Sequence, residues 1–284
     1  MTRLGALLHN FVSVLTWLSG MLILAVPGWF LVALMGTKWE FWDWRFGYLT
    51  LTQELGFYVL LAGIVTSALA FLVMVLHHFI VKQDFGEWSA PVVAMISSAA
   101  GLGWMLFVLD GQAGQPAVLE VSTDLERPPH FTTAFYARRG TDRATTEGEV
   151  RTGRDGRSFA SLQAEHYPDI TTLYIDVPTD EAFRRALLAA RELGLHVSTA
   201  SERSGMFEAA TEGFWFGFRD DVVVRIEAVE TDETGEGDAT PRSRIDIRSI
   251  ARDDVHDGGR NARRVENFLA MMQGEPGAAP PQAG

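Results

Sequence analysis

The chain has 284 residues and no cysteine, and it carries a formal net charge of −12 at pH 7. The absence of cysteine excludes disulfides, thiolate metal sites and cysteine nucleophiles. Residues 112–284 hold twenty of the 24 basic residues and thirty of the 36 acidic residues, a net charge of −10 for this part. Because nucleic-acid binding needs a basic face, we expect no nucleic-acid partner.

Three long stretches without Asp, Glu, Lys or Arg lie in the first 111 residues, at about 11–35, 55–81 and 90–109. Each has the roughly 20 apolar residues that a helix needs to cross a hydrocarbon core. No small-residue cleavage site follows the first stretch, so we expect a retained helix and not a removed signal. Residues 1–111 are therefore predicted to form a transmembrane domain with three spans in a lipid bilayer.

The orientation of these spans is weakly encoded. Arg3 and Lys82 lie on one side and Lys38 and Arg45 on the other, which is a tie under the positive-inside rule. An odd number of spans places the two termini on opposite sides. With the N-terminus inside, we expect a multi-pass protein of the bacterial inner membrane whose C-terminal domain is periplasmic.

Residues 117–271 are predicted to form an α+β domain. The pattern gives an extended segment at 117–122, a strand at 173–177, a helix from Thr179 to Gly194, strands at 196–200, 206–211, 214–218 and 222–229, a strand around Ile245, and a helix after Asp257. Asp220 and Asp221 are interpreted as a hairpin turn. Short turns between strands imply antiparallel pairing. The two amphipathic helices would cover one sheet face as a second layer, and the other face would be open to solvent, a second copy or a groove.

Other segments have little apolar content. We expect residues 138–158 to form an exposed loop and the acidic residues 230–241 a solvated loop. The residues 272–284 are rich in Pro, Ala and Gly, so a disordered tail is predicted there.

Several stretches of this region together form a recognisable signature. They are Val121-Ser-Thr-Asp-Leu-Glu-Arg-Pro-Pro129; His166-Tyr-Pro-Asp-Ile170; Ile245-Asp-Ile-Arg-Ser249 with Arg252; and Asp257, Gly259 and Asn261-Ala-Arg-Arg264. With them, residues 117–271 resemble the DUF1499 family of uncharacterised bacterial and plastid proteins. Members of that family are often envelope proteins, some lipid-anchored and some with a few N-terminal spans. The resemblance therefore implies an outward-facing domain, and it supplies no activity.

A candidate site lies where the strand around Ile245 meets the last helix. Arg248, Ser249 and Arg252 are predicted to converge near the first N–H groups of that helix, where a phosphate or carboxylate would be stabilised. The favoured alternative is an internal ion-pair network, in which acidic residues of the domain pair with its arginines. The full candidate set is Asp124, Asp246, Arg248, Ser249, Arg252, Asp257, Asn261 and Arg264, with Asp124, Asp246 and Asp257 as the expected partners of Arg248, Arg252 and Arg264.

Other chemistry has less support in the sequence. The cluster Asp253, Asp254, His256 and Asp257 offers metal-ligand atoms, but bunched acids in a turn are more often solvated or capping, and we expect no metal and no cofactor. There is no nucleophile elbow, phosphate-binding loop or dinucleotide fingerprint.

These patterns favour a non-enzymatic envelope protein that binds a partner protein, a lipid or a small anion, with a membrane protein or a second copy as candidate partners. The alternative is an enzyme acting on an anionic or envelope substrate, which Arg248 and Arg252 would orient, with Asp246 or Asp257 as acid–base groups.

Overall fold

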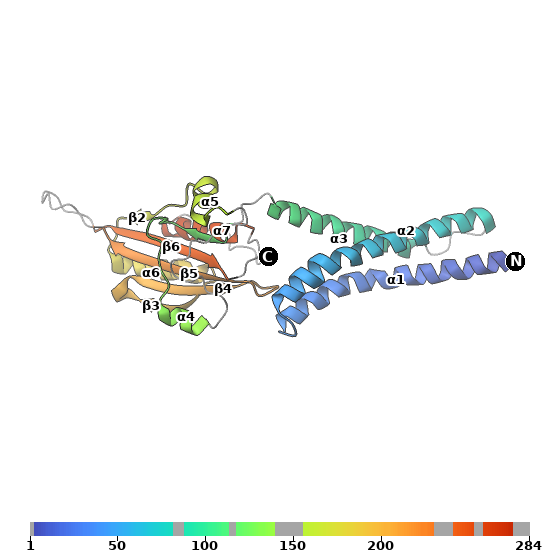
Figure 1. Cartoon of the computed structure of the whole chain (residues 1–284), viewed down its shortest axis with the longest axis horizontal. Coiled ribbons are helices and arrows are strands. Elements are labelled where there is room, and N and C mark those ends of the chain that lie inside the picture. The colour runs from blue at the N-terminus through green and yellow to red at the C-terminus, as the bar shows by residue number, and fades with distance from the viewer. Residues whose placement is uncertain are drawn as a thin grey trace. The chain divides into compact units, whose positions relative to one another are not determined.

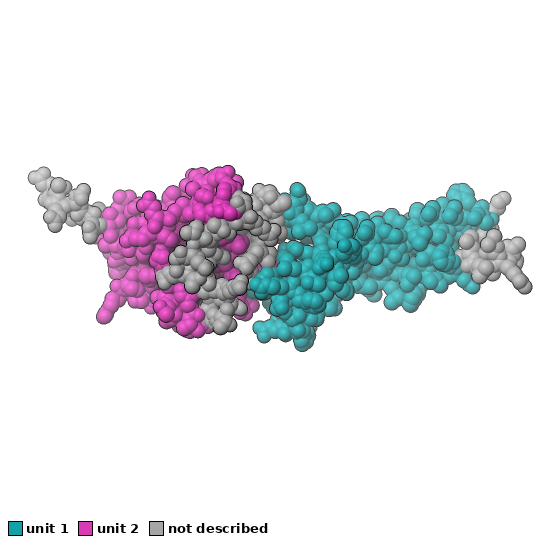
Figure 2. All heavy atoms as spheres, viewed as in Figure 1, with its two compact units in different colours: residues 1–111, 215–217 teal, residues 112–214, 218–284 magenta. Residues whose placement is uncertain are grey.

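The structure is a computed structural model that describes residues 3–81, 88–113, 118–139, 156–229, 241–252 and 258–274. The chain divides into two compact units. Unit 1 comprises residues 1–111 together with 215–217, and unit 2 comprises residues 112–214 and 218–284 (Figure 2). Each unit is described separately below.

Unit 1 consists of long helices (Figure 1). They are α1 (Arg3–Lys38), the π-helix η1 (Arg45–Leu55), α2 (Gly56–Val81) and α3 (Ser89–Ala113). Three segments are long and apolar enough to cross a membrane: Asn10–Lys38, Arg45–Ile80 and Ser89–Gly111. The prediction of three long apolar N-terminal helices is confirmed. The second segment begins earlier than predicted, because η1 continues directly into α2.

Small residues allow close packing within unit 1. A Cβ atom placed on Gly63 of α2 would lie 2.4 Å from the Oγ of Ser98 in α3. A Cβ atom on Gly47 of η1 would lie 1.8 Å from the Oγ1 of Thr37 in α1. Lipid tails are as apolar as the helix surfaces, so helices in a bilayer associate through such close contacts and not through the hydrophobic effect.

Unit 2 is an antiparallel sheet with helices. Its elements are β1 (Glu120–Ser122), α4 (Thr133–Arg139), α5 (Phe159–His166), β2 (Leu173–Ile175), α6 (Thr179–Glu192), β3 (His196–Ser201), the 3₁₀ turn η2 (Glu202–Ser204), β4 (Met206–Glu212), β5 (Arg219–Ala228), β6 (Ser243–Ala251) and α7 (Arg260–Met272). The sheet has six strands in the order β1-β6-β5-β4-β3, and β2 also pairs with β6. All described pairings are antiparallel. The predicted α+β class is confirmed.

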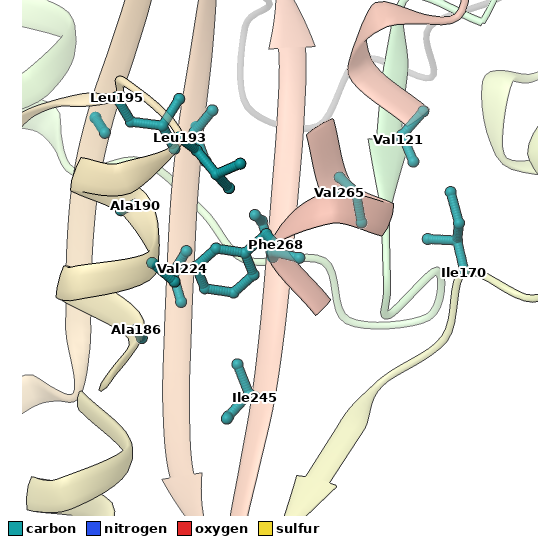
Figure 3. Packing of buried hydrophobic residues seen from close by; sticks show 14 of the residues in the cluster. Val121, Ile170, Ala186, Ala190, Leu193, Leu195, Val224, Ile245, Val265 and Phe268 are labelled. Atoms are coloured by element: carbon teal, nitrogen blue, oxygen red, sulfur yellow. The ribbon is translucent and has the colours of Figure 1, made fainter. Parts of the chain in front are cut away.

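The main core lies between the sheet and the helices α6 and α7 (Figure 3). The alanines of α6, among them Ala186 and Ala190, are buried and bring its backbone close to the sheet. Phe268 of α7 is fully buried and packs in the same cluster as Val224 of β5 and Ile245 of β6. Helical spacing on α6 and α7 and alternation on the strands therefore bury one continuous apolar layer.

The opposite face of the sheet is partly covered by another segment of the chain. Phe131 and Phe135, which lie just before and within α4, form a second small cluster with Val223 of β5 and Ile250 of β6. The two phenylalanine rings are stacked with their centroids 4.8 Å apart. The segment 123–139 therefore covers part of the face that the sequence left unassigned.

Two local predictions are wrong. The residues 214–218 form a turn and not a strand, closed by a 2.7 Å hydrogen bond from the Gly213 N–H to the Phe218 carbonyl. Asp220 and Asp221 are buried members of β5, not turn residues, and they pair in register with Thr211 and Ala210. A short run of aromatic residues resembles a strand, and two adjacent acids resemble a turn, unless distant partners are known.

Two short helices, α4 and α5, were not predicted. The rest of the loop expected at 138–158 falls largely on residues 140–155, which lie outside the described residues. The same holds for most of the acidic loop expected at 230–241 and for the predicted tail from residue 275 onward. Met272, the first residue of that predicted tail, ends α7 and packs in the core.

Candidate functional site

The face of β5 and β6 that turns away from α6 and α7 carries charged residues. In the register of the two strands, Arg225 lies opposite Asp246, and Glu227 lies opposite Arg244. Residues directly opposite one another in an antiparallel pair have their side chains side by side on the same face. The pairing of β5 with β6 therefore brings both signs of charge together on this face.

Three of these side chains, together with Asp124 from the loop after β1, form what we call the central ion cluster: Asp124, Arg225, Arg244 and Asp246. Arg225 Nη2 lies 2.8 Å from Asp246 Oδ2 and 3.1 Å from Asp124 Oδ2. Arg244 bonds to Asp124 through Nη2, and its Nε lies 3.0 Å from Asp246 Oδ2. Asp124, Asp246 and Arg225 are all buried. Two carboxylates and two guanidinium groups thus balance each other inside the domain.

The loop after β1 also stabilises Asp124 as an anion. Its Oδ1 accepts hydrogen bonds from the backbone N–H groups of Glu126 and Arg127, at 3.1 and 2.8 Å. Burial by itself would raise the pKa of this carboxyl. The amide of Arg127 and the charges of Arg244 and Arg225 outweigh that effect and hold the pKa of Asp124 below its usual value.

Asp246 is held from two sides. Its Oδ1 accepts hydrogen bonds from the hydroxyls of Thr123 and Thr172, at 3.2 and 2.6 Å. Burial would lower the pKa of Arg244, but the nearby carboxylates of Asp246 and Asp124 more than compensate and raise it. The cluster therefore holds two acidic and two basic side chains in mutual contact.

Three further arginines are paired with acids outside the central ion cluster. The pairs are Arg248 with Glu120, Arg252 with Asp221 and Arg264 with Asp220, at N–O distances of 2.6, 2.7 and 2.6 Å.

One of these pairs ties the last helix to the sheet. Arg264 of α7 donates from Nη1 to the Oγ of Ser249 at 2.9 Å and to the Oδ1 of Asn261 at 2.8 Å. The Ser249 hydroxyl in turn donates to Asn261 at 2.6 Å. Because Arg264 also reaches Asp220, this buried group connects α7 to both β5 and β6.

The predicted convergence of Arg248, Ser249 and Arg252 is wrong. Ser249 faces α7, while Arg248 and Arg252 turn to the other side of the sheet, where they meet Glu120 and Asp221. Successive residues of a strand alternate between faces, so neighbours in sequence cannot share one site. Ser249, Asn261 and Arg264 do come together.

The predicted pairing of Asp124 and Asp246 with Arg248, Arg252 or Arg264 is also wrong. Their partners are Arg225 and Arg244, which were not among the candidate residues. A signal was present, because Arg225 interrupts a run of valines in a buried strand, and a charge there needs a buried counter-ion. Asp257 lies outside the described residues, as do Asp253, Asp254 and His256. Within the described ranges no group of three or more acidic or histidine side chains is placed to hold a metal ion.

A pocket of about 530 Å³ lies beside the central ion cluster. One wall is the segment 123–125, another is α5 with Gln163 and Ala164, and the third is the segment 167–174. Gln163 fixes two of these walls to each other, because its amide exchanges hydrogen bonds of 2.6 and 2.9 Å with the backbone of Ser122. Thr123 and Thr172 line the pocket and bond to Asp246, so the cluster supports the pocket wall.

We predict that Arg225→Met destabilises the protein by about 3–5 kcal/mol, because removing one partner leaves buried carboxylates short of compensation. Arg184→Met is the matched control. Arg184 pairs with Asp180 on the exposed surface of α6, and such solvent-screened pairs contribute little to stability. Denaturant unfolding of the purified full chain measures both. Equal losses in the two variants would contradict a buried central ion cluster.

We predict that Asp124 contributes to acid sensitivity. The pKa of Asp124 is held below its usual range in the folded chain. The stabilising effect of the carboxylate is therefore complete above the pKa of an unfolded aspartate, about 3.9, and it disappears as the pH falls through the lowered pKa. Asp124→Asn should reduce stability at neutral pH and flatten the dependence of stability on pH below about 4. Unfolding curves from pH 7 to pH 2 test this. Parallel curves for the variant and the parent would show that the carboxylate is not stabilised as described.

A family model described as "Protein of unknown function (DUF1499)" matches residues 120–272, which is more than half of the chain. The matched region runs from β1 to the last residue of α7 and includes the central ion cluster and the pocket. No curated protein and no solved structure gives a significant match. On the strength of the family match, the chain belongs to the DUF1499 family.

Proposed function

We propose that this protein is a membrane-tethered binding protein, and that the pocket beside the central ion cluster takes a small, uncharged, hydroxyl-rich ligand. The pocket carries the proposal. Its volume of about 530 Å³ falls within the range typical of small-molecule sites, roughly 300–1,000 Å³. Its walls come from residues 123–125 and 167–170, which belong to two of the stretches on which the family resemblance rests.

The charge balance supports an uncharged ligand. Asp124 is the charged residue in the pocket wall, and Arg225 and Arg244 offset it. The predicted anion site depended on Arg248 and Arg252, which are already bonded to acidic side chains. An anion would have to displace a carboxylate from its arginine, whereas a neutral ligand would leave these pairs intact.

The lining chemistry supports a ligand with both hydroxyl groups and an apolar face. Thr171 offers an exposed hydroxyl, and Tyr167 and Tyr174 offer rings with a polar tip. The guanidinium of Arg242 lies 5.0 Å from the centre of the Tyr174 ring and helps to hold that ring in place. A sugar, either free or as a lipid headgroup, has both hydroxyl groups and an apolar face.

The same geometry favours binding over catalysis. A general acid or base works best when its pKa lies near the working pH. The pKa of Asp124 is instead lowered, which takes it further from neutral pH. In the alternative enzyme, Arg248 and Arg252 would orient an anionic substrate, but both are engaged with Glu120 and Asp221. A membrane protein or a second copy is the other candidate partner, and it would bind outside the pocket.

The proposed location follows from the helices of unit 1. Three candidate spans support a multi-pass membrane protein. We place the protein in the bacterial inner membrane, with the N-terminus inside and the DUF1499 domain in the periplasm. The odd number of spans puts the two ends of the chain on opposite sides, and the outward-facing domain that the family resemblance implies supports the choice between the two orientations.

We predict that Ala164→Trp weakens ligand binding, because the indole would fill the pocket that Ala164 lines. Ala160→Trp is the matched control at an exposed position of the same helix, α5, one turn before Ala164 and outside the residues that line the pocket. Ligand-observed NMR with the full chain in detergent would use N-acetylglucosamine as the neutral probe and inorganic phosphate as the anion. We expect the sugar to bind the parent and Ala160→Trp and to bind Ala164→Trp at least about tenfold more weakly, a change of 1.4 kcal/mol.

Two outcomes would contradict this proposal. Phosphate binding that Ala164→Trp removes would make the pocket an anion site. Equal sugar binding, or its complete absence, in the parent and both variants would show that the pocket does not take such a ligand.

We predict that Ser204→Cys reacts with a membrane-impermeant maleimide in intact spheroplasts. The chain has no native cysteine, and Ser204 is exposed in the turn between β3 and β4, so this position reports where the domain lies. Labelling before lysis is expected for a periplasmic domain. Labelling that appears only after lysis would reverse the proposed orientation.

A further inference from the structure

The hairpin of β4 and β5 ends in what we call the aromatic tip, the three successive residues Phe214, Trp215 and Phe216. The tip forms a turn, in which 53% of Phe214 and 38% of Trp215 are exposed. Aromatic side chains of this size are normally buried, and a cluster of them at a surface marks an interaction site.

The base of the hairpin is charged, in contrast to its tip. Glu212 and Arg219 lie opposite each other in the strand register and form an ion pair with 3.1 Å between Oε2 and Nε. The guanidinium of Arg260 lies 5.2 Å from the centre of the Phe218 ring. The chain between Glu212 and Arg219 contains no charged residue. The hairpin therefore changes from polar to aromatic over a single turn.

This polarity matches the boundary between water and lipid. Aromatic rings with a polar edge, tryptophan above all, favour the headgroup layer of a bilayer, and charged groups favour the aqueous side. We propose that the aromatic tip inserts into the interface of the bilayer that the N-terminal helices cross. This inference is independent of the ligand proposed for the pocket.

The membrane spans point to lipid as the occupant, because the same chain carries three candidate spans. Tethering keeps a bilayer within reach of the domain at high effective concentration, so a tip of three aromatic residues needs to contribute only a small free energy of insertion.

The charge of the domain explains why an uncharged tip is suited to this contact. Residues 112–284 have a net charge of −10, and an acidic surface is repelled by anionic lipid. An apolar contact does not depend on the sign of the headgroup charge. The tip would therefore bring the domain to a bilayer that the remainder of its surface avoids.

The absence of native cysteine permits a direct test. Phe214→Cys and Trp215→Cys, each carrying one nitroxide label, would be reconstituted as full chains in phosphatidylcholine vesicles. Collision with oxygen and with a water-soluble nickel complex reports the depth of each label. Ser204→Cys is the matched control, because it is exposed at the opposite end of β4. Labels at 214 and 215 should lie about 5–10 Å below the headgroup boundary, and the label at 204 should lie in water.

Two results would overturn the proposal. Access to the nickel complex at 214 and 215 equal to that at 204 would place the tip in water. Protection of both labels from oxygen as well as from nickel would show burial against protein, in a second copy or elsewhere. As a check on folding, Trp215→Asp combined with Phe214→Cys should keep the circular dichroism spectrum of the parent while the label becomes more accessible to nickel.

Discussion

The pairing of Arg225 with Asp246 and Asp124 is the interaction on which the rest of the domain depends. An unpaired buried charge costs several kcal/mol, so β5 and β6 must keep the register that places Arg225 opposite Asp246. The loop after β1 must also fold back, because Asp124 completes the charge balance. That loop is one wall of the pocket. The shape of the pocket is therefore set by electrostatics as much as by packing.

The two faces of the sheet are stabilised by different interactions. The face toward α6 and α7 buries aliphatic and aromatic side chains and supplies the hydrophobic free energy of the fold. The other face pairs charges beneath the segment 123–139. Hydrophobic packing is tolerant of small shifts, whereas hydrogen-bonded charges need defined geometry. The second face thus gives the domain a precise surface next to its pocket.

The sequence predicted features whose signal is local. A hydrocarbon core excludes charge, so three long uncharged stretches predicted three spans, and a 3.6-residue period predicted α6 and α7. The predictions from the sequence were wrong where the structure depends on contacts between residues that lie far apart in the sequence. Asp221 is buried because Arg252 meets it, and spacing alone does not say which of several arginines will pair with which acid. The alternation within a strand, applied strictly, would have separated Ser249 from Arg248.

The wrongly predicted strand at 214–218 is the most informative of these failures. A continuous aromatic run indicates that side chains leave water, but it does not say whether they enter a protein core or a lipid interface. Here the run sits at the end of a hairpin, beyond an ion pair between Glu212 and Arg219, where no strand continues the ladder. Natural sequences depart from local rules mainly where function requires it. In a chain with three candidate spans, a bilayer is the second apolar phase to which we assign the side chains that leave the sheet at this turn.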